Sequence, residues 1–232
     1  MQNLSLNMLL SVSFDNAFNF AYVFKSIITR WYLYLLLLAV IIGVVLFAVL
    51  VKQPKRNNLS KTQKLVYTAI FSALLVVVNI FQIPTPLAQF SFVATIACIA
   101  GILLGPISGF AVAFIGDLIA GIVAPLGPYS PIIGIATSLY GLVPGVVFAF
   151  FKGKDLPKII ISFAITFILS SIVLNTIGLS LIYPKVYVLA DRLAMLPFTL
   201  LFHAVNTVLS VIILKMLRRI LGSSKFFIDY TK

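Results

Sequence analysis

Residues 91–124 read SFVATIACIAGILLGPISGFAVAFIGDLIAGIVA, and this stretch decides the fold class. It contains one charged residue, Asp117, and its apolar residues come in long runs instead of alternating or one-sided patterns. Long apolar runs are typical of helices that span a membrane. Gly105-Pro106 divides the stretch into two short, Gly-rich segments. These are either two plain spans or two tilted or broken helices packed inside a bundle.

The same character extends over the whole chain. Of its 232 residues, 62% are hydrophobic and 9% are charged, whereas soluble domains average about 45–50% apolar and about 25% charged residues. A soluble core of this length cannot hide so much apolar surface, so lipid must be the solvent for much of it. The sequence predicts an all-α integral membrane protein with spans near 31–51, 66–82, 91–104, 109–124, 130–151, 159–182 and 193–215.

The basic residues behind the net charge of +12 lie mostly in short segments between and after these spans. This pattern indicates how the chain is oriented in the membrane and does not indicate a nucleic-acid partner. Thirteen of the 17 basic residues lie in segments that seven spans place on one side of the membrane: Lys52, Lys55, Arg56, Lys61 and Lys64; Lys152, Lys154 and Lys158; and Lys215, Arg218, Arg219, Lys225 and Lys232. Because positive loops stay inside, we expect a multi-pass protein of the cell membrane with its amino terminus outside and its carboxyl terminus in the cytoplasm.

The polar linker 52–64 separates a one-helix appendage from a compact bundle. We expect residues 1–30 to form either an interfacial helix or an irregular tail, and residues 31–51 to form an extra transmembrane helix. The six-helix bundle covers 65–217, and a basic cytoplasmic tail covers 218–232. The single cysteine, Cys98, cannot form an internal disulfide and does not fix the compartment.

Catalytic motifs are missing from the sequence. It contains one histidine, His203, five aspartates and no glutamate, and it has no His-Glu-x-x-His pair, Gly-x-Ser-x-Gly turn or P-loop. An intramembrane hydrolase needs a nucleophile with a base, or a metal with its ligands. We therefore expect no enzyme activity, no catalytic residue, no metal and no cofactor.

Small residues recur at four-residue spacing, which lets membrane helices approach closely. For Gly101, Gly105 and Gly109, and for Gly141 and Gly145, we expect internal packing. For Ala69 and Ala73 the alternative is a face that docks on another membrane protein.

Asp117 lies well inside an apolar run, where a carboxylate is costly unless it is hydrogen-bonded. We expect a structural role, with hydrogen bonds from backbone N–H groups or from Ser and Thr hydroxyls at a helix break. A proton-coupled role is the alternative.

The predicted outer side suggests a ligand pocket. Aromatic rings with few polar groups suit an organic ligand, although they also form the usual interfacial belt. An arginine among them can clamp a carboxylate. The tentative substrate-binding residues, including two deeper polar groups, are Arg192, Tyr183, Tyr187, Tyr129, Gln89, Phe92, Asn175 and His203.

Several motifs in order over 64–215 resemble the substrate-binding S component of energy-coupling factor (ECF) transporters, specifically the folate-type family. They are Ala69-x-x-x-Ala73, the run from Ala100 to Gly109, Gly116-Asp117-Leu118-Ile119, Tyr129-Ser-Pro131 with Tyr140-Gly141-Leu142, Leu174-Asn175-Thr176, and Asp191-Arg192-Leu193.

The resemblance implies a six-helix bundle in the lipid bilayer that binds a vitamin, with folate as the best guess, in an outward-facing pocket. It also implies partners, namely a transmembrane coupling protein with two ATP-binding-cassette ATPases, on which Ala69 and Ala73 would dock. The extra amino-terminal helix departs from that family. Two rival functions remain open: a proton-coupled secondary transporter using Asp117, and a membrane scaffold without a small-molecule ligand.

Overall fold

The computed structural model describes residues 59–84, 89–124, 130–182 and 189–221, and six helical residues between Tyr32 and Gly43. Side chains are described in these ranges except at 83–84, 89–90, 179–182, 189–194 and 221. The predicted extra helix over 31–51 lies largely outside the described residues and stays a prediction.

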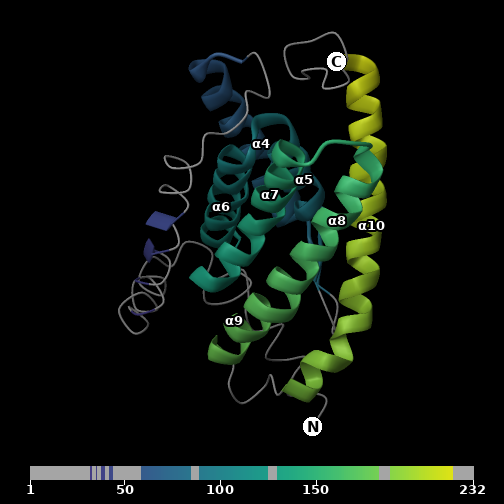
Figure 1. Cartoon of the computed structure of the whole chain (residues 1–232). Helices are drawn as coiled ribbons and strands as arrows, with labels where there is room; N and C mark the ends of the chain where they lie inside the picture. Colours follow the sequence, from purple (N-terminus) through teal and green to yellow (C-terminus); the bar gives the residue numbers. More distant parts are fainter. Residues whose placement is uncertain are drawn as a thin grey trace.

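Within the described ranges from Leu59 onward, six helical rods form an all-α bundle, which confirms the predicted fold class (Figure 1). The helices are α4 (Lys61–Ile80), α5 (Val93–Leu104), α6 (Pro106–Val123), α7 (Pro131–Phe150), the continuous rod α8–η2–α9 (Asp155–Thr166, Phe167–Leu174 and Asn175–Ile182), and α10 (Leu189–Leu221). Five of the rods are long and apolar enough to cross a membrane. The chain is therefore a multi-pass membrane protein.

Local sequence explains where the rods begin and turn. Ser60 caps α4 in a reciprocal capping box with Gln63, whose N–H donates to Ser60 Oγ at 3.1 Å. Gly105 ends α5 with a φ of 98°, a left-handed conformation that glycine adopts without strain, and Pro106 begins α6 at once. The predicted break at Gly105-Pro106 is thus a tight reversal between two packed helices.

Helix α5 is the central helix of the bundle. At 12 residues it is about 18 Å long, while the hydrocarbon core of a bilayer is about 30 Å thick. Ten of its residues are buried, and it packs against α4, α6, α7 and α10. The chain before it forms a minimal hairpin in which β1 (Ile83–Pro84) pairs antiparallel with β2 (Gln89–Phe90). The sequence left open whether residues 91–124 form two plain spans or two helices packed inside the bundle. The structure shows one of each: α5 is a short inner helix, and α6 is long enough to span the membrane.

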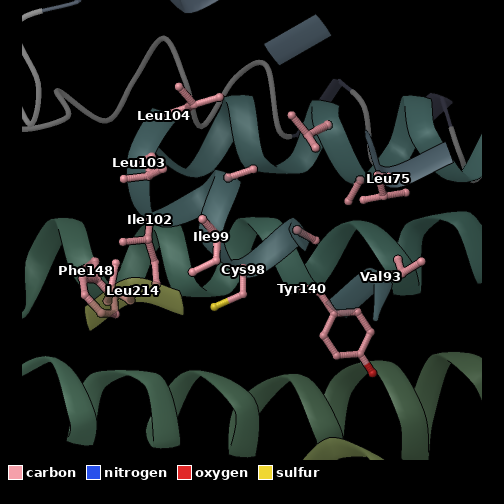
Figure 2. Packing of buried hydrophobic residues seen from close by; sticks show 14 of the residues in the cluster. Leu75, Val93, Cys98, Ile99, Ile102, Leu103, Leu104, Tyr140, Phe148 and Leu214 are labelled. Atoms are coloured by element: carbon pink, nitrogen blue, oxygen red, sulfur yellow. The ribbon is translucent and has the colours of Figure 1, made fainter. Parts of the chain in front are cut away.

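The apolar core gathers around α5. Leu75 of α4, Phe148 of α7 and Leu214 of α10 belong to the same buried cluster as α5 side chains such as Ile99 and Leu103 (Figure 2). The outward faces of α4 and α10 carry exposed large hydrophobic side chains instead. This arrangement is expected where lipid surrounds the bundle.

We name the two ends of the bundle by what lies there. The hairpin end holds β1, β2, the start of α7 and the end of α9. The basic end holds the start of α8 and the end of α10. Here Arg218 forms an ion pair with Asp155 through two contacts, Nη2 to Oδ1 at 2.8 Å and Nε to Oδ2 at 2.6 Å. This ion pair shows that two of the three basic segments share one end, as predicted. That this end faces the cytoplasm stays a prediction.

Candidate functional site: polar clusters inside the bundle

A buried polar cluster joins α7, η2 and α10 midway along the bundle. Tyr140 Oη lies 2.6 Å from His203 Nε2 and 3.2 Å from Ser171 Oγ. His203 Nδ1 lies 2.9 Å from the carbonyl oxygen of Thr199. Because a carbonyl only accepts, the proton of the neutral ring belongs on Nδ1, and Nε2 accepts from Tyr140. The single histidine is therefore held in one orientation.

Aromatic rings enclose this histidine. The Phe167 ring centroid lies 5.0 Å from that of His203, and the Phe163 centroid lies 6.5 Å away, both nearly edge to face. The hydroxyl of Tyr140 is directed away from the apolar side chains of the core (Figure 2). The cluster therefore sits at the border between the α5 core and the α8–η2–α9 rod.

The helix that carries Ser171 is irregular at this point. Residues Phe167–Leu174 form a π-helix, and the Asn175 N–H donates to the carbonyl of Ser170. Short π-helical segments are rare and are found preferentially at functional sites. Two buried polar atoms here, Ser170 Oγ and Asn175 Oδ1, have no hydrogen-bond partner. Because buried polar groups in native proteins usually have a partner, these two atoms make the π-helical region a candidate site.

Asn206 ties α10 to the start of α5. Its Oδ1 accepts from Thr95 Oγ1 at 2.7 Å, and its Nδ2 donates to the carbonyls of Ser91 at 3.2 Å and Phe202 at 2.9 Å. Asn206 therefore bonds to a neighbouring helix as well as to its own. It holds the chain where it leaves the hairpin and enters α5.

Asp117 joins three helices. Its Oδ1 accepts from Asn79 Nδ2 of α4 at 3.4 Å and from Thr137 Oγ1 of α7 at 3.3 Å. The Thr137 hydroxyl also lies 3.0 Å from the carbonyl of Ile133. These contacts agree with a structural role, but the expected helix break is wrong: Asp117 lies inside the continuous helix α6. The bonds come from side chains of neighbouring helices.

The small residues that recur every four positions lie in two different environments: the glycines are inside the bundle, and the alanines are on its surface. A Cβ on Gly141 would collide with the backbone of Gly109, and a Cβ on Gly101 would collide with the carbonyl of Gly141. These glycines are internal packing points where α5, α6 and α7 meet, as predicted. Ala69 and Ala73 are exposed on the outward face of α4.

Most of the predicted ligand residues lie outside the described side chains. These are Arg192, Tyr183, Tyr187, Tyr129 and Gln89. Of the remainder, Phe92 is 41% exposed at the start of α5, while Asn175 and His203 lie in and beside the π-helical region. No group of three or more His, Cys, Asp and Glu side chains suited to a metal occurs among the described residues.

Two members of the polar cluster were not predicted from the sequence: Tyr140, which is part of a family motif, and Ser171. Paired serines at 170 and 171 within an apolar run were the available signal, since Ser in membrane helices often bonds to a neighbouring helix. Nothing in the residue pattern announces the π-helix itself.

The model of one known protein family matches most of this chain. The family model described as "ECF transporter, substrate-specific component" matches residues 63–218. No curated protein matches the sequence.

Two solved structures are similar in fold. The first is described as "Crystal structure of FolT bound with folic acid" and is 21% identical, with a TM-score of 0.58; the match covers 65% of this chain and 91% of that one. The second, described as "Structure and mechanism of the S component of a bacterial ECF transporter", is 19% identical, with a TM-score of 0.54 over 71% of this chain and 98% of that one. Because the family model spans more than half of the sequence, this chain belongs to the family of substrate-specific S components of ECF transporters.

Proposed function

We propose that this S component captures a folate-like vitamin at the hairpin end of the bundle. We further propose that it delivers the vitamin by docking, through the α4 face around Ala69 and Ala73, on a transmembrane coupling protein that carries two ATPases. Membership of a family of transporter substrate-binding components, rather than of enzymes, supports this function. The same proposal includes three further points: the hairpin end faces outward, the bundle covers residues 65–217, and residues 31–51 form an extra helix.

Similarity to a protein with folic acid bound supports the choice of vitamin. The unpartnered Asn175 Oδ1 supports a ligand with polar groups near the π-helix. In this proposal His203 and Asn175 lie beneath the ligand. Phe92, Gln89, Tyr129, Tyr183, Tyr187 and Arg192 enclose it from the hairpin end.

The exposure of Ala69 and Ala73 is the observation that carries the docking proposal. The glycines with the same spacing are buried in contacts between helices, whereas these alanines face outward. Their neighbours Val66, Ile70 and Val77 are also exposed, so the face is smooth and apolar. A row of small side chains lets a second membrane helix approach closely.

Docking can be separated from ligand binding by enlarging this face. We expect Ala69→Trp with Ala73→Trp to abolish folate uptake in cells, because the indole rings hold a partner helix away. Folic acid binding to the purified chain should remain unchanged. The matched control is Ala164→Trp on the exposed face of α8, which should leave uptake intact.

Loss of folic acid binding in the double variant would instead show that this face supports the bundle internally. Equal loss of uptake in the Ala164 control would show that any bulky residue on the lipid-facing surface is harmful. Either outcome contradicts docking through α4.

The proton-coupled alternative predicts something different. If Asp117 carried protons, Asp117→Asn would abolish uptake, and uptake would continue without any ATPase. The contacts from Asn79 and Thr137 support a structural role, which an asparagine side chain can largely reproduce. We therefore expect Asp117→Asn to retain uptake and to lower stability slightly. A folded chain that binds no small molecule would favour the scaffold alternative.

A further inference from the structure

Helix α7 begins without a side-chain cap. Ser130 is its N-cap residue, with φ −115° and ψ 116°, and from this position a serine hydroxyl usually accepts from an N–H of the first turn. No such bond forms here. Pro131 has no N–H, and the N–H of Gly134 donates to the carbonyl of Ser130 at 3.1 Å. The N–H groups of Ile132 and Ile133 therefore have no carbonyl acceptor within the helix.

The Ser130 hydroxyl is itself an unpartnered buried group. The residue is only 3% exposed, and its Oγ makes no hydrogen bond. A serine inside a helix can turn its hydroxyl to the carbonyl four residues earlier, as Ser138 does to Gly134 at 2.7 Å. Ser130 precedes its helix, and its Oγ makes no such bond. As the N-cap residue, Ser130 lies directly before the open first turn.

A second unpartnered atom lies on the neighbouring helix. Gly178 of α9 packs against the start of α7, where a Cβ on Gly178 would come within 3.1 Å of Ile133 Cγ1. Asn175, whose Oδ1 is buried without a partner, is one turn from Gly178 toward the middle of the bundle. Unpartnered polar atoms thus lie on both sides of the contact between α7 and α9.

We propose that the start of α7 binds the carboxylate end of the captured vitamin. The Ser130 hydroxyl and the N–H groups of Ile132 and Ile133 donate to the carboxylate, and the positive end of the helix dipole favours its charge. The Asn175 amide faces a neutral polar part of the same ligand. Two turns further along α7, the Thr137 hydroxyl already lies 3.0 Å from the carbonyl of Ile133 and 3.3 Å from Asp117 Oδ1, so its one proton is committed to these acceptors. This assignment rests on the proposed vitamin-capture function.

The test uses the purified full chain in detergent with two probes, folic acid and its dimethyl ester, titrated by calorimetry. The ester keeps the skeleton and lacks both carboxylates. We expect Ser130→Ala to weaken folic acid binding by roughly tenfold or more, because hydrogen bonds to charged acceptors are strong. The same change should leave the affinity for the ester within about twofold, since a neutral acceptor contributes far less.

Two further variants control the result. Ser130→Thr keeps a hydroxyl at the N-cap and should retain folic acid affinity. Ser138→Ala removes a fully buried hydroxyl of the same helix that already has an acceptor, and should change neither affinity. The proposal is overturned if Ser130→Ala weakens both probes equally, if it changes neither, or if threonine fails to rescue a folded variant.

Failure of the folate assignment would look different. If the wild-type chain binds neither probe, the small molecule that copurifies with it is identified by mass spectrometry. A copurified vitamin with a carboxylate discards folate and keeps the carboxylate site, whereas a molecule without any acidic group overturns the site. Absence of any bound molecule overturns both proposals.

Discussion

At the scale of single residues, the unusual feature is the bond between Tyr140 and His203. Without the Tyr140 hydroxyl, His203 Nε2 keeps only the long 3.4 Å contact to Ser171 Oγ, and a membrane bundle offers little water as a replacement partner. We expect Tyr140→Phe to destabilise the protein by roughly 1–3 kcal/mol, seen as a lower midpoint of thermal unfolding in detergent.

The control is a double-variant comparison with His203→Leu. Since the two residues share one hydrogen bond, their separate losses should not add in the doubly substituted protein. Fully additive losses would show that Tyr140 and His203 act independently, which contradicts the bond.

At the scale of helices, the packing of α5, α6 and α7 depends on glycines. In Gly141→Ala, the new methyl group would meet the backbone of Gly109, which cannot rotate away. We expect a loss of about 3 kcal/mol in stability and a lower yield of folded protein in size-exclusion chromatography.

Gly178→Ala provides the comparison. Its methyl group would meet side-chain carbons of Ile133 and Ile132, which can shift. The loss should therefore be clearly smaller than for Gly141→Ala. Similar losses of stability in the two variants would mean that the contact between α7 and α9 tolerates an added methyl group no better than the contact between Gly141 and Gly109.

At the scale of the whole molecule, orientation is open to a direct test. Cys98 is fully buried, so a single introduced cysteine can report which side is accessible. If the hairpin end faces outward as proposed, a membrane-impermeant maleimide should label Gln82→Cys in intact cells. It should label Lys154→Cys only after permeabilisation. The opposite pattern would reverse the proposed orientation and move the vitamin site to the cytoplasmic side.

The sequence alone determined the membrane class, the rods of the bundle and the division between two helices at Gly105-Pro106. Lipid offers no partner to a backbone N–H, so an apolar run of sufficient length must be helical. The helix boundaries were predicted less accurately: α8 begins at Asp155 instead of near 159, and α10 extends over Leu189–Leu221 instead of 193–215. Charged and polar helix ends carry no apolar signal that would mark them.

Only the tertiary structure decided which polar groups meet. Tyr140 and His203 are 63 residues apart, and Asn79 and Asp117 are 38 apart. Such pairs depend on how each helix is rotated about its axis, and helices that are apolar on all sides carry little periodic signal for that rotation. The π-helix and the uncapped start of α7 were hidden for a related reason. The spacing of residue types along each rod is the same with or without them.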